Sequence, residues 1–296
     1  MTPRVSVLMP VKDGERYLGE AIDSILNQTF TDFEFIIIND GSTDRTAEII
    51  RAYGDPRIRT INNSSSVGVA ISLNNGIDRA VGEYIARMDC DDISLPERLA
   101  KQVSYMDAHP AIAASGTWAK DIDADGREFG ERCLPFGERM KYEFWRPSPI
   151  VHPSAIIRAS QLGSLRYDFR LTHGEDFDLW LGLKARYDLG NIPEHLLLYR
   201  VHPASLTSQY RENQIRSTHE IVARQLGLKV SFAAFQHLVG TLPDVNPISR
   251  IVARWRLARA IHISYRNYLS EDLAYARNWL RARFAPRSSR QPAREG

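Results

Sequence analysis

Three aspartates stand within four residues, at Asp89, Asp91 and Asp92, directly after an apolar run that predicts a buried strand. Carboxylates this close repel one another, and a bound cation relieves the repulsion. Hard oxygen ligands suit Mg²⁺ or Mn²⁺, which take their remaining ligands from water and from substrate phosphates. The cluster therefore predicts a divalent metal site that also receives phosphate. The alternative is a capped turn that leads into a helix at Pro96.

Two further acidic segments are candidates for chemistry. The turn from Asp40 to Asp44, with the sequence DGSTD, follows a second apolar run, and Asp40 could accept hydrogen bonds from a nucleobase or ribose. The alternative is a plain strand-to-helix turn. Glu175 and Asp176 begin a predicted helix, where the helix dipole alone favours an acid. The functional alternative for this pair is a general base that takes a proton from a hydroxyl.

Other motifs are incomplete or absent. Asp121, Asp123 and Asp125 followed by Gly126 begin like a calcium-binding loop, but Arg132 occupies the twelfth position, where a bidentate Glu is needed. A hairpin turn is the better interpretation of this segment. The sequence contains no GxGxxG, GxxxxGK[ST], HExxH or GxSxG pattern. This argues against dinucleotide enzymes, P-loop ATPases, zincins and α/β-hydrolases.

The segments that must position these residues alternate between strand and helix patterns. Apolar runs predict strands at residues 5–11, 33–38, 57–61, 83–88 and 111–119. Helical spacing predicts helices at 15–28, from Thr43 or Asp44 to about 54, at 69–81, and from Pro96 onward. Such alternation is typical of an α/β protein with a mostly parallel sheet flanked by helices, in which ligands bind beyond the carboxyl ends of the strands. Beyond residue 120 the pattern predicts a hairpin turn at 121–130, a helix at 175–187, a strand at 195–201 and helices after about 211.

Composition indicates the class of protein. The 296 residues are 43% apolar and 25% charged, as in ordinary soluble globular proteins. The only two cysteines, Cys90 and Cys133, cannot form a disulfide framework, which favours a reducing compartment. The sequence has neither the apolar segment of a signal peptide nor a run long enough to span a bilayer. We therefore predict a cytoplasmic protein, with peripheral attachment at the inner face of the plasma membrane as an extension of that prediction.

Charge is distributed unevenly along the chain. Residues 247–296 contain eleven arginines, no lysine and three acidic residues, which gives +8. Because the whole chain carries +2, residues 1–246 carry −6. Arginines interleaved with Trp255, Trp279 and Phe284 could bind an anionic membrane surface. The alternative is a set of helices packed on the rest of the protein or on a dimer partner. Nucleic acid is not an expected partner, because the positive charge is confined to the tail and no recognition motif accompanies it.

The order of these motifs resembles that of the family 2 glycosyltransferases, which adopt the GT-A fold. The similar segments are Met9–Leu18, Ala21–Phe30, Phe35–Asp44, Gly82–Asp92, Gly174–Trp180 and Tyr199–His202. The resemblance covers about residues 4–210. It implies an inverting, metal-dependent transfer of a sugar from a nucleotide-sugar donor to an acceptor hydroxyl.

The resemblance also implies roles for single positions. The residues expected to contact the nucleotide-sugar are Pro10, Val11, Asp13, Asp40, Asn74, Arg87, Asp89 and Glu175. Asp91 would ligate Mn²⁺ or Mg²⁺, and Asp89 and His202 are further candidates for contact with the metal. Asp176 would be the catalytic base. A single displacement would then invert the anomeric centre without a covalent sugar–enzyme intermediate.

A GT-A catalytic domain is expected at residues 1–212, with a nucleotide-binding half at about 1–110 and an acceptor-side half at 111–212. A helical, arginine-rich extension would follow at 213–296. The expected partners are a nucleotide-sugar, with UDP the commonest nucleotide in the family, and a sugar or lipid-linked glycan acceptor in surface polysaccharide or glycolipid assembly. The QxxRW motif of processive members is absent, which favours transfer of a single sugar.

Some positions depart from the commonest family pattern and affect only fine donor contacts. Lys12-Asp13 stands where Tyr-Asn is frequent, Asn39 where a second Asp is frequent, and Leu73 where Arg is usual. Two rival functions remain at this point. One is a non-catalytic nucleotide-sugar-binding protein with a degraded site. The other is a sugar-phosphate nucleotidylyltransferase, which would need a glycine-rich loop after the first strand.

Overall fold

The structure is a computed structural model that describes residues 2–140, 149–203 and 211–226. Residues Met1–Thr218 form one compact unit. Four parallel strands lie side by side in the order β3-β2-β1-β4. Their bounds are Val5–Val11 for β1, Phe33–Asp40 for β2, Ile58–Asn63 for β3 and Tyr84–Arg87 for β4. The predicted parallel, helix-covered sheet is therefore confirmed for this part of the chain.

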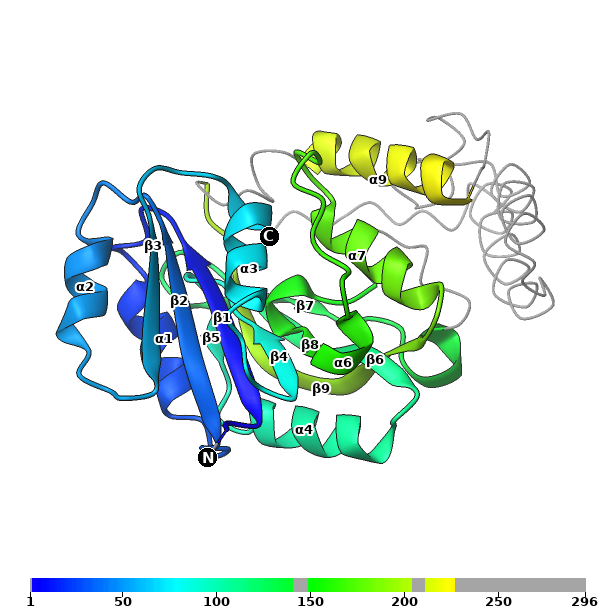
Figure 1. Cartoon of the computed structure of the whole chain (residues 1–296), viewed down its shortest axis with the longest axis horizontal. Coiled ribbons are helices and arrows are strands. Elements are labelled where there is room, and N and C mark those ends of the chain that lie inside the picture. The colour runs from blue at the N-terminus through cyan, green and yellow to red at the C-terminus, as the bar shows by residue number, and fades with distance from the viewer. Residues whose placement is uncertain (1, 141–148, 204–210, 227–296) are drawn as a thin grey trace, which may run out of the picture. The chain divides into compact units, whose positions relative to one another are not determined.

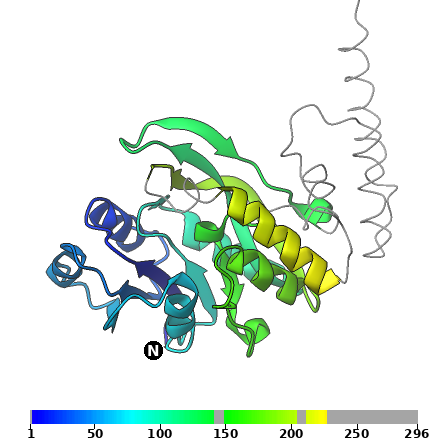
Figure 2. The same ribbon diagram turned by 90° about the horizontal axis from the view of Figure 1, so that it is seen from above.

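The sheet continues beyond β4 as a mixed sheet. Within the described residues it has nine strands, and the order after β4 is β8-β6-β9-β5, with β7 paired to β6. The bounds are Ile93–Ser94 for β5, Ile112–Ile122 for β6, Glu128–Arg132 for β7, Ile156–Arg158 for β8 and Asp188–Arg200 for β9. β6 and β9 are parallel, whereas β8, β7 and β5 run antiparallel to their neighbours. Figure 2 shows the β6–β7 hairpin as an arm at one border of the sheet.

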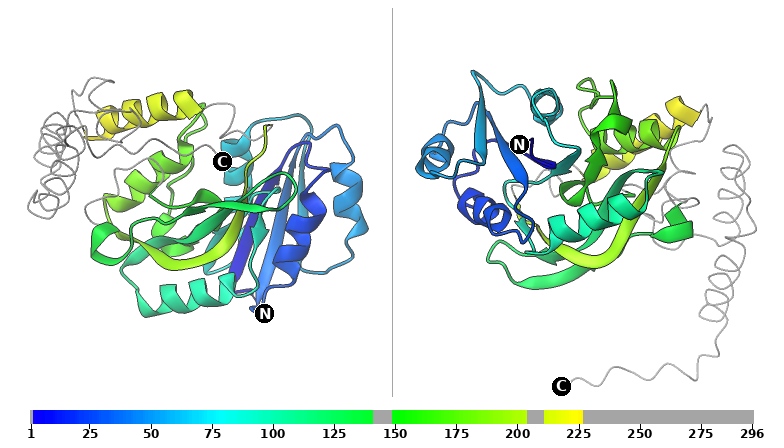
Figure 3. Two further views of the ribbon diagram at one scale, coloured as in Figure 1. Left: turned by 180° about the vertical axis from the view of Figure 1, so that it is seen from behind. Right: turned by 60° about the horizontal axis from the view of Figure 1, so that its bottom comes forward.

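Helices cover both faces of the sheet (Figures 1 and 3). One face packs against α1 (Leu18–Leu26), α2 (Thr46–Ala52) and α4 (Arg98–Ala108). The other packs against α3 (Val69–Ile77), α6 (Ala159–Leu162) and α7 (Glu175–Lys184). Alternate residues of β1 supply the two cores: Val7 and Met9 join the first, and Leu8 joins the second. Burial on both sides explains why the central strands are continuous apolar runs.

Some boundaries differ from the prediction. The strand predicted at 195–201 begins at Asp188, and Pro96 lies two residues before α4 instead of in its first turn. The Pro96 carbonyl accepts hydrogen bonds from the backbone N–H and the hydroxyl of Thr29 (2.9 and 3.1 Å), which holds this residue in the preceding turn. The helix α9 (Arg211–Leu226) begins where helices were predicted to begin. No helix among the described residues is both long enough and apolar enough to cross a bilayer.

The arginine-rich tail, together with the predicted break between Pro243 and Pro247, lies outside the described residues.

Candidate active site

The turns that follow β1 and β2 are tied together by Asp13. This residue has a left-handed backbone (φ +48°), and its Oδ1 accepts hydrogen bonds from the backbone N–H (2.8 Å) and hydroxyl (3.3 Å) of Thr43. The Asp13 N–H in turn donates to Ser42 Oγ (3.0 Å), and the Glu15 N–H donates to Asp44 Oδ2 (2.9 Å). The predicted DGSTD turn is thus positioned by the carboxylate and backbone of the loop after β1.

Asp40 is buried at the end of β2, and its carboxylate receives four hydrogen bonds. Oδ1 accepts from Asn63 Nδ2 (2.8 Å) and the Val67 N–H (2.9 Å), and Oδ2 accepts from Ser66 Oγ (2.9 Å) and the Gly68 N–H (2.9 Å). Burial alone would raise the pKa of Asp40, but these donors outweigh it and hold the pKa below its ordinary value. In this structure Asp40 orders the segment before α3, so a contact with the nucleobase remains a prediction.

Asp40→Asn should lower the free energy of unfolding by about 2–3 kcal/mol at pH 7, because the new amide NH₂ would face two hydrogen-bond donors. The folded-state pKa of Asp40 lies below the ordinary value of 3.8. Its contribution is therefore complete above that value and is lost as the pH falls through the folded-state pKa. Urea unfolding at pH 7 and at pH 3 should show the difference between wild type and variant shrinking in acid. A difference independent of pH would contradict this assignment.

The three clustered aspartates follow β4 and lie together. One carboxylate oxygen from each of Asp89, Asp91 and Asp92 lies within 4.8 Å of the others. Asp92 is buried; its Oδ1 accepts a hydrogen bond from the Arg200 N–H (2.8 Å), and its buried Oδ2 lacks a hydrogen-bond partner among the described residues. Burial and then the neighbouring carboxylates raise the pKa of both Asp91 and Asp92. Converging oxygens of this kind, one of them unpartnered, fit a hard divalent cation.

His202, for which the family resemblance implies contact with the metal, lies against this cluster. Its Nε2 is 3.0 Å from Asp91 Oδ2, and it lowers the pKa of Asp91 against the effect of burial. The ring of Tyr17 packs beside the imidazole, with 5.2 Å between centroids. His202 is therefore placed to orient Asp91 or to contact a metal that Asp91 binds.

Arg87 connects the aspartate cluster to the pair of acids on α7. Its buried guanidinium forms an ion pair with Asp89, and its positive charge lowers the pKa of both Glu175 and Asp176. Burial is the larger effect and raises both pKa values, to about 7 for Glu175. Asp89 acts on both acids too, by raising their pKa values. The two acidic segments, 86 positions apart in the chain, thus belong to one electrostatic environment.

Arg200 was not predicted as a site residue, although it lies in the quoted segment Tyr199–His202. Its side chain is almost fully buried and forms an ion pair with Glu20 of α1. Its Nε donates to the Asp91 carbonyl (2.8 Å), and its guanidinium lies 4.4 Å from the centre of the Tyr17 ring. Arg200 therefore holds the backbone of the aspartate turn against α1. The sequence offered one signal, an arginine two residues before His202, but its burial could not be read from the sequence.

Other predicted donor contacts are used inside the protein. Asn74 pairs with the backbone of Tyr167, accepting from its N–H (3.0 Å) and donating to its carbonyl (2.9 Å). Pro10 and Val11 are buried in β1, and Val11 belongs to the core that packs against α1. The predicted hairpin is present: the chain turns at residues 123–127 between β6 and β7, and Asp123 Oδ1 accepts from the N–H groups of residues 125 and 127.

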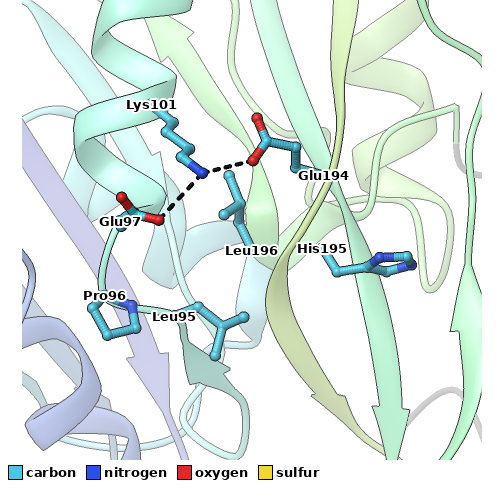
Figure 4. Close-up of a pocket in the computed structure, with 7 residues that line it drawn as sticks. All are labelled: Leu95, Pro96, Glu97, Lys101, Glu194, His195 and Leu196. Atoms are coloured by element: carbon cyan, nitrogen blue, oxygen red, sulfur yellow. Dashed lines mark hydrogen bonds and ion pairs between the residues drawn. The ribbon is translucent and has the colours of Figure 1, made fainter.

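A groove lies apart from these acids, between the start of α4 and β9 (Figure 4). Its lining residues are Leu95, Pro96, Glu97, Lys101, Glu194, His195 and Leu196. Lys101 Nζ bridges Glu97 (3.2 Å) and Glu194 (2.6 Å) across it. None of the predicted site residues lines this groove, so it is not the candidate active site.

The fold and the site together define a GT-A-type protein with a carboxylate cluster at the carboxyl end of its parallel strands. The sequence of residues 6–163 matches the family description "Glycosyl transferase family 2". Relatives agree: the chain is 40% identical over 207 residues to an uncharacterized glycosyltransferase of Methanocaldococcus jannaschii, covering 67% of this chain and 71% of that protein. The chain therefore belongs to glycosyltransferase family 2.

Two other relatives have more specific names. The O-antigen biosynthesis glycosyltransferase WbnJ of Escherichia coli is 33% identical over 208 residues, which is 68% of this chain and 81% of WbnJ. The putative glycosyltransferase EpsE of Bacillus subtilis is 38% identical over 185 residues, which is 60% of this chain and 66% of EpsE.

Solved structures support the fold. S. aureus TarS 1–349 in complex with UDP-GlcNAc aligns with a TM-score of 0.64 at 17% identity, over 88% of this chain and 81% of that one. The mannosyltransferase PcManGT of Pyrobaculum calidifontis, in complex with GDP-Man and Mn²⁺, aligns with a TM-score of 0.61 at 19% identity, over 95% and 81%. The expected GT-A architecture is thereby confirmed.

Proposed function

We propose that this glycosyltransferase moves a single sugar from a nucleotide-sugar, most simply a UDP-sugar, to an acceptor hydroxyl with inversion at the anomeric carbon. The observation that carries the proposal is that the aspartate cluster and the acidic pair on α7 both lie within the electrostatic influence of the buried Arg87 guanidinium. Arg87 forms an ion pair with Asp89. The same guanidinium lowers the pKa of Glu175 and of Asp176 at the start of α7. A binding site for a divalent cation and a candidate base thus occupy one site.

In this proposal Asp176 is the general base. Its carboxylate is half-buried, and the loss of contact with water raises its pKa, which strengthens it as a proton acceptor. Gly174, in a left-handed backbone conformation (φ +80°), turns the chain into α7 so that both acids fall in its first turn. Glu175 contacts the donor or acceptor, and Arg87 holds Asp89 in place. The acceptor hydroxyl, losing its proton to Asp176, attacks from the face opposite the leaving nucleotide.

A divalent cation would be held by Asp91, with Asp89 and Asp92 in the same cluster as further possible ligands and His202 beside Asp91. When bound, Mn²⁺ or Mg²⁺ would neutralise charge that develops on the departing nucleoside diphosphate. The protein contributes the fixed positions of the carboxylates. Arg200 secures them by binding the Asp91 carbonyl with its side chain and Asp92 Oδ1 with its N–H.

The names of relatives support a role in polysaccharide assembly. WbnJ is named for O-antigen biosynthesis, and AmsE of Erwinia amylovora, 28% identical over 230 residues, for amylovoran biosynthesis. We extend the proposal to a sugar or lipid-linked glycan acceptor at the cytoplasmic face of a membrane. The arginine-rich tail at 247–296 would meet the anionic surface there, as its composition predicts.

The proposal is tested by nucleoside diphosphate release from a panel of UDP-, GDP- and TDP-sugars, with Mn²⁺, with Mg²⁺ and with EDTA. Slow hydrolysis of one donor that requires the metal would identify the donor. Release of pyrophosphate from a nucleoside triphosphate and a sugar phosphate would favour the nucleotidylyltransferase. Metal-dependent donor binding with no turnover, even with acceptor extracts present, would favour the non-catalytic rival.

The dependence of the reaction rate on pH should show the titration of Glu175. Because burial raises its pKa to about 7, we expect kcat/KM to rise through an inflection near that pH as the acidic pair loses a proton. Glu175→Gln should remove this inflection. Glu194→Gln, which changes a carboxylate of the separate groove, should retain it. An inflection near 7 that persists in Glu175→Gln would exclude Glu175 as its source.

A further inference from the structure

A second group of metal-ligand side chains lies away from the active site, where the β6–β7 hairpin meets β9. Glu131 lies near the end of β7 and Cys133 directly follows its last residue, so the two side chains, two positions apart, project to the same side of the hairpin. His195 comes from β9, on the other side of β6. Figure 4 shows that its imidazole projects away from Lys101 and Leu196. Three ligand types from two distant segments therefore meet at one point.

The three ligand atoms form a nearly equilateral triangle. Cys133 Sγ is 3.8 Å from His195 Nε2 and 3.9 Å from Glu131 Oε2, and the last two atoms are 3.8 Å apart. The centre of such a triangle is about 2.2 Å from each corner, which is 3.8 Å divided by √3. Bonds from Zn²⁺ to sulfur, imidazole nitrogen and carboxylate oxygen are about 2.0–2.3 Å long. One ion could therefore reach all three atoms with shifts of a few tenths of an ångström.

The cation nearest to these ligands is Lys120, which lies opposite Glu131 on β6 and interacts with its charge. The neighbouring cations have other partners: Lys120 Nζ pairs with Glu128 (2.7 Å), and Arg132 Nε pairs with Asp121 (2.5 Å). The indole of Trp118 packs beside the His195 ring, with 5.4 Å between centroids, and restricts its orientation.

We propose that Glu131, Cys133 and His195 form a second metal site, specific for Zn²⁺-type ions and distinct from the carboxylate site. A thiolate and an imidazole select borderline-soft ions, whereas the all-oxygen aspartate cluster suits Mg²⁺ or Mn²⁺. Three protein ligands leave a fourth position for water. The bound ion would clamp the β6–β7 hairpin onto β9, so its role is to fix the arm that borders the sheet.

Co²⁺ is the probe, because it takes zinc sites and reports its ligands by absorbance. The full chain, stripped with EDTA and kept reduced, is titrated with Co²⁺ in excess Mg²⁺. We expect a thiolate-to-cobalt charge-transfer band that Cys133→Ser abolishes and Cys90→Ser retains. Asp91→Asn should keep the band, which separates this proposal from the proposed catalytic function. Absence of the band in wild type, or its persistence in Cys133→Ser, overturns the proposal.

Zinc affinity and thiol protection provide a second measurement. Competition with a chromophoric chelator should show at least tenfold weaker Zn²⁺ binding in His195→Gln. His109→Gln, which changes an exposed histidine directly after α4, should stay within twofold of wild type. A measurement on the wild-type protein avoids any folding defect that a substitution causes. Zn²⁺ should slow alkylation of wild-type Cys133 by iodoacetamide at least tenfold, as followed by peptide mass spectrometry. Equal alkylation with and without Zn²⁺, or equal affinity in His195→Gln, would also refute the site.

Discussion

Asp91→Asn should lower metal-dependent nucleoside diphosphate release by about 10³-fold or more and abolish the advantage of Mn²⁺ over EDTA. The asparagine has nearly the same shape but lacks the charge that a divalent cation requires. In the folded protein Asp91 sits beside Asp89 and Asp92, and burial raises its pKa. The ionised Asp91 carboxylate therefore destabilises the folded state, and a bound cation would offset this destabilisation.

The measurement is initial-rate kinetics with a metal titration, combined with calorimetric titration of UDP and Mn²⁺. Asp125→Asn is the matched control, because this carboxylate lies exposed on the hairpin turn, where it pairs with Arg127 (3.8 Å). It should behave as wild type. If Asp91→Asn kept metal-dependent turnover within tenfold of wild type, Asp91 would not be the principal ligand.

Asp176→Asn should lower kcat by about 10²–10⁴-fold while donor and metal binding stay close to wild type. The amide cannot accept the proton of the acceptor hydroxyl, but it can occupy the same space in the first turn of α7. The effect should therefore appear in the chemical step. Asp178→Asn, a change on the same helix turn, should leave kcat within about threefold of wild type.

The same substitution should stabilise the protein. The folded-state pKa of Asp176 is raised above its ordinary value of 3.8, so ionised Asp176 destabilises the folded state at every pH above that value. Removing the charge should raise the melting temperature at pH 8 and leave it nearly unchanged at pH 3. A variant that was both inactive and less stable at pH 8 would indicate a structural role. Full activity in Asp176→Asn with loss in Glu175→Gln would transfer the role of base to Glu175.

Much of the fold could be predicted because its central strands are buried on both faces. β1 has the predicted bounds, since a strand without a solvent face is an uninterrupted apolar run. β5 and β8, with two and three residues, are too short to carry any periodicity. β9 begins seven residues before its prediction, because Gly190, Asn191 and Pro193 break the apolar pattern that identifies strands.

The candidate active site could also be predicted only in part. Clustered charge is visible in a sequence, so Asp89 to Asp92 and the pair at 175–176 were identified from local pattern and family resemblance. The partners of a polar side chain are set by the fold. Sequence alone could not show that Asp40 binds the backbone before α3, that Asn74 pairs with Tyr167, or that Arg200 reaches the carbonyl of Asp91.

The ion pair between Arg200 and Glu20 joins positions 180 residues apart. A ribosome must therefore have released at least the first 200 residues before the aspartate turn can acquire its final support. Until then the emerging chain holds three neighbouring carboxylates with neither Arg200 nor His202 beside them. Catalytic competence should thus appear abruptly and late during synthesis, after the parallel half of the sheet has had time to form.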